Sequence, residues 1–136
     1  MSPNRRRQIL LVDDDAELVT VVGDRLRGEG FHVIPACTAA EGLHILQRRT
    51  PDLIVLDIGM RGMNGITFLD RVAACGGRRP RIIVLTARPN SEELARHPAA
   101  AAVVAKTSGS ENLLREIHRL LPAAAAAADA ALAEPG

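Results

Sequence analysis

The sequence predicts an α/β fold of three layers, in which one parallel sheet of five strands lies between two layers of helices. Short apolar runs of strand length alternate with helical patterns along the chain, and this alternation is typical of βα units. The run Leu53–Leu56 is apolar at every position, as expected of a strand that is buried on both faces of a parallel sheet. It ends at Asp57, where an open α/β sheet places its chemistry.

Length and composition limit the class of protein. A chain of 136 residues corresponds to one domain, and 47% hydrophobic residues suffice for a core. The net charge of +1 argues against a general attraction to nucleic acid or to a membrane surface. No run approaches the roughly 20 apolar residues of a spanning helix, and the N-terminus lacks the apolar segment of a signal peptide. We therefore expect a cytoplasmic protein, with Cys37 and Cys75 as free thiols.

The first half of the chain supplies strands that alternate with helices. A strand is predicted at 8–12, and the apolar spacing that follows it predicts a helix ending at Gly28. A second strand is predicted at 31–36, and the sequence from Thr38 to Glu41 matches a capping box at the start of the second helix. The apolar face of the first helix is predicted to consist of Leu18, Val21, Val22 and Leu26.

The chain continues with the same alternation after Asp57. Glycines in the loop 58–65 end the third strand and lead to a helix. The residues of this helix that are predicted to point inward are Ile66, Leu69 and Ala73. A fourth strand follows at 81–85.

The last two βα units carry fewer apolar residues. A helix that starts at 90–93 is predicted to be cut short by Pro98. A fifth strand is predicted at 101–105, and the sequence from Ser108 to Glu111 matches a second capping box before the final helix. His97 and His118 are expected to be surface residues. The chain is thereby divided into a flexible N-terminus at 1–7, a folded domain at 8–121 and an alanine-rich tail at 122–136.

Polar residues directly follow four of the predicted strands. Because the carboxyl ends of parallel strands meet at one edge of a sheet, we expect these side chains to share one shallow crevice. The aspartates at 13–15 also precede a helix, but a helix cap accounts for only one or two of the three. The candidate site residues are Asp13 and Asp14 after the first strand, Asp57 after the third, Thr86 after the fourth and Lys106 after the fifth, and Lys106 is the only lysine among 17 basic residues.

The residue types at this edge indicate phosphoryl chemistry. Carboxylates that share a crevice repel one another, so exchange of Asp14 for Asn is expected to stabilise the metal-free protein. A hard cation such as Mg2+ removes the repulsion and prefers oxygen ligands, whereas zinc favours the His and Cys that are absent from these positions. A carboxylate beside such a cation can attack a phosphoryl group, and a lysine can neutralise the phosphoryl oxygens.

Five features together resemble the receiver domain of response regulators in bacterial two-component signalling, over residues 8–121. They are Ile9–Asp15, Leu56–Met60, Asn64-Gly65, Leu85–Ala87 and Lys106. The resemblance implies a flavodoxin-like sheet with the strand order 2-1-3-4-5. It also implies that Asp57 is the phosphoacceptor, that Mg2+ is held by Asp13, Asp14, Asp57 and the backbone carbonyl of Gly59, and that Thr86 and Lys106 contact the phosphoryl group.

The resemblance further implies the partners. A sensor histidine kinase or a histidine phosphotransfer protein would donate the phosphoryl group, and a downstream effector protein would be contacted in response. We expect no direct DNA binding, because no helix-turn-helix follows the domain, and no contact with a membrane. The expectation is therefore a stand-alone receiver that is no enzyme toward other molecules and catalyses only its own phosphorylation and dephosphorylation.

Two of the departures from the family pattern leave an alternative open. Thr107 follows the lysine where the family usually has a proline in a cis peptide, and Val103 stands where the family usually has the aromatic residue of its switch. These departures favour a non-phosphorylated interaction module on a receiver scaffold, whereas the intact acidic residues oppose it. A phosphatase of the haloacid dehalogenase type also forms an aspartyl phosphate, but it needs a second aspartate where this chain has Gly59.

Overall fold

The computed structural model describes residues 7–58, 65–74, 80–87, 97–106 and 109–121 of the 136-residue chain. The predicted helix start at 90–93, the tail at 122–136 and most of the loop 58–65 lie outside the described residues. The elements are β1 (Gln8–Val12), α1 (Ala16–Gly28), β2 (His32–Ala36), α2 (Ala39–Leu46), β3 (Leu53–Asp57), α3 (Gly65–Ala74), β4 (Arg81–Thr86), β5 (Ala100–Ala105) and α5 (Ser110–Leu120).

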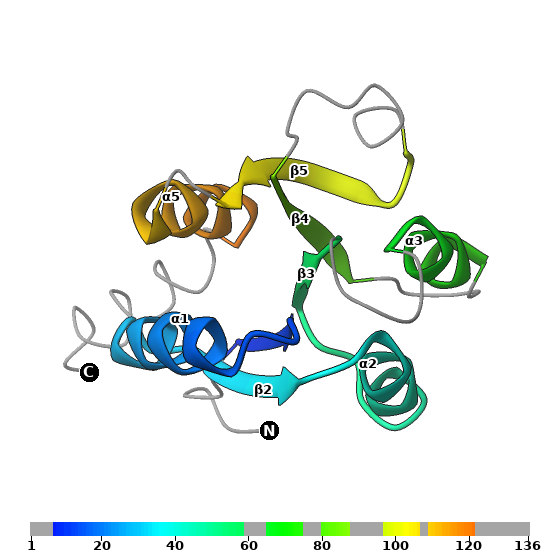
Figure 1. Ribbon diagram of the computed structural model, residues 1–136, viewed down its shortest axis with the longest axis horizontal. Coiled ribbons are helices and arrows are strands. Elements are labelled where there is room, and N and C mark those ends of the chain that lie inside the picture. The colour runs from blue at the N-terminus through cyan, green and yellow to red at the C-terminus, as the bar shows by residue number, and fades with distance from the viewer. Residues whose placement is uncertain (1–6, 59–64, 75–79, 88–96, 107–108, 122–136) are drawn as a thin grey trace, which may run out of the picture.

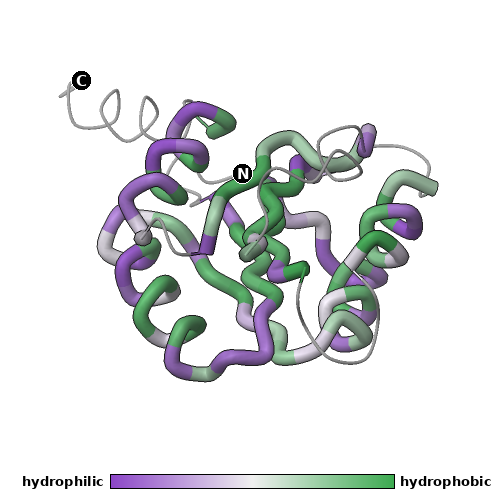
Figure 2. The backbone as a smooth tube through the Cα atoms, turned by 45° about the horizontal axis from the view of Figure 1, so that its top comes forward, coloured by the Kyte–Doolittle hydropathy of each residue, from purple (hydrophilic) through white to green (hydrophobic). Residues whose placement is uncertain are grey.

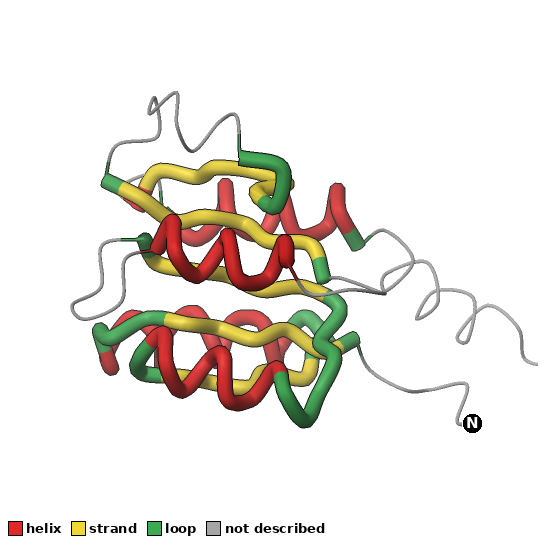
Figure 3. Tube along the Cα trace, turned by 90° about the vertical axis from the view of Figure 1, so that its right-hand side faces the viewer, coloured by secondary structure: helices red, strands yellow, loops and turns green. Residues whose placement is uncertain are grey.

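The five strands form one parallel sheet in the order β2-β1-β3-β4-β5. Helices α1 and α5 cover one face of the sheet, and α2 and α3 cover the other (Figure 1). Figure 3 shows the same three layers from the side, with α2 and α3 in front of the strands. The predicted α/β fold and the strand order implied by the resemblance are both confirmed.

Each face of the sheet has its own hydrophobic core. One cluster joins alternate strand residues to α1 and α5, and the other joins the remaining strand residues to α2 and α3. All five residues of β3 are buried, so this strand contributes to both clusters. The hydrophobic residues along the central strands stand out in Figure 2. Within the described residues, every helix is too short or too polar to cross a bilayer.

The amino edge of the sheet is fastened by polar contacts. Asp52 lies just before β3, and its carboxylate accepts a hydrogen bond of 2.7 Å from the backbone N–H of Gln8 at the start of β1. The guanidinium of Arg81, at the start of β4, donates a hydrogen bond of 2.8 Å to the carbonyl of Leu120 at the end of α5. These contacts satisfy polar groups at the start of two strands and at one helix end.

Helix starts agree with the sequence in one case and differ in another. The hydroxyl of Thr38 accepts a hydrogen bond of 3.0 Å from the N–H of Glu41, as the first capping box predicts. The second capping box, predicted for Ser108 to Glu111, differs, because the N-cap of α5 is Gly109 and no side chain of the described residues caps this helix. Ser108 itself lies outside the described residues. Gly109 has φ of 82°, a conformation that favours glycine.

Two predicted helix faces also need correction. Val21 is 59% exposed, although the apolar spacing of α1 places it with the inward residues. In α3 the fully buried residues are Phe68 and Leu69, and Ile66 and Ala73 are only half-buried. Leu69 is thus inward as predicted and Ile66 packs against the core, while Phe68 and Val72 complete the buried face of α3.

Gly65 sets how closely α3 approaches the end of β3. A Cβ atom at this position would overlap the side chain of Ile58 and would lie 3.0 Å from the Cα of Ile58. Ile58 follows Asp57 directly, so the close approach brings the start of α3 against the carboxyl edge of the sheet.

We expect Gly65→Ala to lower the free energy of unfolding by about 1–3 kcal/mol, because the added methyl group must displace Ile58 or the helix. Urea denaturation measures the change. Gly28→Ala is the matched control, because Gly28 also lies in a helix but has open space around the added Cβ atom. Equal losses of stability in the two variants would contradict the steric explanation.

Candidate functional site

The register of the sheet brings the polar strand ends together. Val12 is paired with Leu56, so Asp13 and Asp57 follow at the same level on neighbouring strands. Asp57 is in turn paired with Leu85 on β4. Thr86 is paired with Ala105 on β5, and Lys106 comes next. The expected convergence of four strand ends on one edge is what the structure shows.

The three consecutive aspartates have different surroundings. Asp15 caps α1, and its Oδ1 accepts hydrogen bonds from the N–H groups of Glu17 and Leu18 at 3.0 and 3.2 Å. Asp13 is fully buried, and its Oδ1 accepts a hydrogen bond of 2.9 Å from the N–H of Asp15. Asp14 is exposed. One aspartate therefore serves the helix, and two remain for the crevice.

Carboxylate oxygens of Asp13, Asp14 and Asp57 lie within 4.8 Å of one another. Asp57 is only 2% exposed. The Oδ2 atom of Asp13 is buried and has no hydrogen-bond partner among the described residues. This cluster contains an unsatisfied buried oxygen and no nitrogen or sulfur ligand, so its donor set fits a hard cation such as Mg2+. Gly59, which the resemblance adds to the metal ligands, lies outside the described residues.

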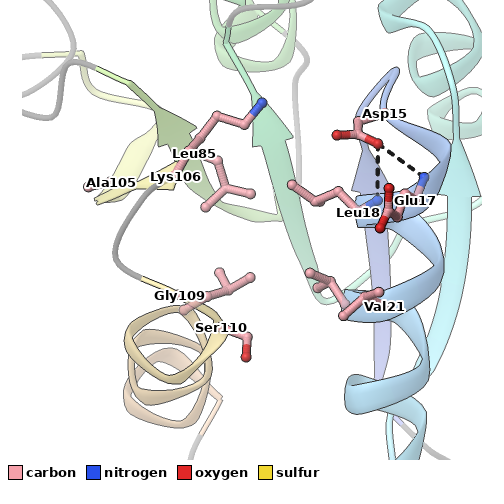
Figure 4. Close-up of a pocket in the computed structure, with 11 residues that line it drawn as sticks. Asp15, Glu17, Leu18, Val21, Leu85, Ala105, Lys106, Gly109 and Ser110 are labelled. Atoms are coloured by element: carbon pink, nitrogen blue, oxygen red, sulfur yellow. Dashed lines mark hydrogen bonds between the residues drawn. The ribbon is translucent and has the colours of Figure 1, made fainter.

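Lys106 is the cation of this cluster. Its Nζ donates a hydrogen bond of 2.8 Å to Asp57 Oδ2 and lies 3.9 Å from Asp13 Oδ2. Figure 4 shows its side chain extending from the end of β5 toward the end of β3. Partial burial by itself lowers the pKa of Lys106, but the hydrogen bond with Asp57 and the charges of the three carboxylates outweigh it and raise the pKa above its ordinary value.

The pKa of Asp13 is raised from its ordinary value of 3.8 to about 6. Burial is the largest cause, and the charge of Asp57 adds to it. The hydrogen bond from the N–H of Asp15 and the charge of Lys106 act in the opposite direction without cancelling the rise. Asp13 is therefore held at a cost as a carboxylate in the metal-free fold, chiefly because it is buried and in addition because Asp57 lies close to it.

Thr86 is the remaining predicted site residue that the structure describes. It is 4% exposed and lies at the end of β4, beside the strand that carries Asp57. Its position at this edge is the predicted one, and its hydroxyl belongs to a residue type that can donate to a phosphoryl oxygen.

A groove beside the acidic cluster was not predicted. It has a volume of about 340 Å³ and runs between α1 and the start of α5. Its lining includes Leu18, Val21, Leu113 and the side chain of Lys106 (Figure 4). The sequence contained one indication of this groove, the apolar residue Val21. Helical spacing assigned Val21 to the core, whereas it is exposed and lines the groove.

Comparison with known proteins gives a consistent result. The family model of the response regulator receiver domain matches residues 9–118. The DNA-binding response regulator MtrA of Mycolicibacterium paratuberculosis is 36% identical over 89 residues, which cover 65% of this chain and 39% of MtrA. The curated relatives are longer proteins, and the match covers as little as 18% of the transcriptional regulatory protein GlrR of Escherichia coli.

Solved structures agree with the architecture. The chemotaxis response regulator CheY4 of Vibrio cholerae has a TM-score of 0.77 at 26% identity, covering 86% of this chain and 100% of CheY4. The response regulator TrrA of Thermotoga maritima, solved in complex with Mg2+ and BeF, has a TM-score of 0.72 at 26% identity, covering 85% of this chain and 99% of TrrA.

We expect Asp13→Asn to stabilise the metal-free protein at pH 7.5, because it removes a buried charge without removing the acceptor for the N–H of Asp15. The rise of the pKa from 3.8 to about 6 corresponds to roughly 3 kcal/mol of the free energy of unfolding. Between pH 6 and pH 4 the folded protein binds a proton at Asp13 more tightly than the unfolded chain does. The stability of the wild type should therefore rise as the pH falls through 6. The advantage of the variant should therefore vanish near pH 4.

Urea denaturation in EDTA at several pH values measures this difference. Asp24→Asn is the control, because the side chain of Asp24 is 72% exposed on α1. An Asp13→Asn variant that is no more stable than the wild type at pH 7.5 would contradict the conclusion that the buried charge of Asp13 destabilises the metal-free fold.

Proposed function

Because the chain belongs to the family of response regulator receiver domains, we propose that it accepts a phosphoryl group on Asp57 in a Mg2+-dependent reaction and passes the signal on by protein contact. The observation that carries the proposal is the arrangement at the edge of the sheet. A buried aspartate lies between a lysine and two further carboxylates that suit a divalent cation.

The residues of this edge have separate tasks in the proposed reaction. A carboxylate oxygen of Asp57 attacks the phosphorus of the donor, forming the acyl phosphate P–O bond as the bond from phosphorus to the leaving group breaks. Asp13 and Asp14 would hold Mg2+, which supplies positive charge to the phosphoryl oxygens when bound. Lys106 exchanges its hydrogen bond with the carboxylate of Asp57 for one with a phosphoryl oxygen, and Thr86 donates its hydroxyl to another.

The resting state of the cluster is unfavourable for a phosphoryl donor. Lys106 Nζ donates a hydrogen bond of 2.8 Å to the Oδ2 atom of Asp57, so this oxygen is already paired. The neighbouring carboxylates also repel an anionic phosphoryl group. Mg2+ held by Asp13 and Asp14 would offset the negative charge of the cluster. Lys106 would then be available to stabilise the transferred phosphoryl group.

The proposed partners follow from this chemistry. A sensor histidine kinase or a histidine phosphotransfer protein donates the phosphoryl group, and an effector protein reads the phosphorylated state in the cytoplasm. MtrA is described as DNA-binding, but the match to this chain covers 39% of MtrA, so DNA binding is not carried over. Apart from its own phosphorylation and dephosphorylation, we propose no enzymatic activity.

A second candidate function is an interaction module that is never phosphorylated. It is favoured by Val103, which is half-buried against the cluster on the α2 and α3 face where the family usually has an aromatic switch residue. The two candidates differ in one observable, the formation of the acyl phosphate.

Incubation with Mg2+ and acetyl phosphate is expected to add one phosphoryl group, detected as a single mass increase of the intact protein. Asp57→Asn should abolish the addition, because an amide does not attack phosphorus. Asp52→Asn is the matched control, since Asp52 lies at the other end of the same strand and an amide oxygen can still accept from the N–H of Gln8. An unmodified wild-type protein would favour the second candidate.

Mg2+ alone is expected to raise the unfolding midpoint of the wild type, because it binds the folded carboxylate cluster. At 100 times its dissociation constant, a ligand that binds only the folded state adds about 2.7 kcal/mol. Asp13→Asn should lose this response while Asp24→Asn keeps it, and scanning fluorimetry with an extrinsic dye in a Mg2+ series measures both. A Mg2+ response that survives in Asp13→Asn would remove Asp13 from the ligand set.

A further inference from the structure

The position of Lys106 depends on β5, yet the sequence of β5 specifies its own register only weakly. The strand consists of four alanines and two valines, lies at the end of the sheet order, and has only Val104 buried. A shift by one residue would mostly exchange alanine for alanine or for valine, so side-chain packing discriminates poorly between registers. Some other contact must hold the strand that delivers Lys106 to within 2.8 Å of Asp57.

His97, three residues before β5, makes contacts that can hold it. Its Nδ1 accepts a hydrogen bond of 3.1 Å from the backbone N–H of Ala99, so Nδ1 carries no proton. Its Nε2 therefore bears the proton and donates to Asp70 Oδ1 on α3 at 2.7 Å. The side chain of His97 is only 10% exposed, so the expectation of a surface residue is wrong. In Figure 1 the start of β5 lies over α3.

The backbone next to His97 contains an irregularity that needs such support. Ile82 is paired with Ala100 and Ile83 with Ala102, so Ala101 is an extra residue in β5. The carbonyl of His97 accepts a hydrogen bond of 3.1 Å from the N–H of Ala100. His97 is thus bound to both residues that precede the irregularity, and through its ring to a helix on the face of the sheet.

We propose that His97, clamped by Asp70, is a positioning residue for phosphorylation. It fixes the entry of β5 and thereby the register that places Lys106 on Asp57. The expected effect on the rate of phosphorylation rests on the proposed function. The expected effect on the position of Lys106 does not. The clamp acts from the amino end of β5, and Lys106 lies at the other end of the same strand.

The chain offers matched controls. A second histidine–carboxylate pair joins His118 Nε2 to Glu29 Oε1 at 3.1 Å, with side chains 38% and 40% exposed. This pair links α5 to the residue that follows α1, away from the hydrogen bonds that His97 makes. Asp70→Asn keeps an oxygen that accepts from Nε2 of His97, whereas Asp70→Ala removes it, and Asp70 is 66% exposed, so neither change disturbs the core.

Two readouts test the clamp at a temperature well below the unfolding midpoint of each variant. One is the initial rate of phosphorylation by acetyl phosphate in saturating Mg2+. The other is the rate at which an acetylating ester modifies Lys106, followed by peptide mass spectrometry. Because Lys106 is the only lysine, its acetylation reports directly whether its amine is held by Asp57.

We expect His97→Ala and Asp70→Ala to slow phosphorylation about tenfold, as for a misplaced catalytic group, and to speed acetylation of Lys106 severalfold. His118→Ala and Asp70→Asn should match the wild type in both readouts. The clamp is refuted if His97→Ala and Asp70→Ala change neither rate, or if they lower only the unfolding midpoint. If the wild type accepts no phosphoryl group, the proposed function fails, and acetylation of Lys106 alone decides on the clamp.

Discussion

Two buried carboxylates at the end of an apolar sheet impose the constraint on which the rest of the structure depends. Asp13 and Asp57 are 0% and 2% exposed, and the strands that carry them offer hydrophobic side chains on both faces. Buried charge of this kind is unfavourable unless positive charge lies close by. The compensation therefore has to come across the edge, from Lys106 on β5 or from a bound cation. This dependence links the stability of the fold to the occupancy of its site.

Much of this arrangement can be predicted from the sequence. The apolar run ending at Asp57 indicates a buried parallel strand, and the alternation of strands and helices gives the fold class. The convergence of Asp13, Asp57, Thr86 and Lys106 follows because parallel strands share one carboxyl edge. Strand bounds differ from the predictions by one residue, as for β2, β4 and β5. The strand order was implied by the family resemblance, since periodicity alone does not select it.

What could not be predicted depends on neighbours that are distant in sequence. Val21 fits the apolar stripe of α1, but it is exposed and lines the groove between α1 and α5. His97 stands in a polar segment, and its ring is bound to Asp70 on α3, 27 residues earlier. The cap of α5 was assigned to a side chain, whereas Gly109 relies on its backbone conformation. Local patterns carry no information on these contacts.

The polar contacts at the amino edge of the sheet affect which substitutions such a protein can tolerate during evolution. At the amino edge, Asp52 joins β3 to β1 and Arg81 joins β4 to the end of α5. The strand β3, with five residues at about 3.3 Å each, separates this edge from Asp57 by roughly 16 Å. Substitutions that far apart contribute nearly independently to stability. Residues at the reactive edge can therefore change to suit another donor or another lifetime of the acyl phosphate. The contacts at the amino edge meanwhile keep the fold stable.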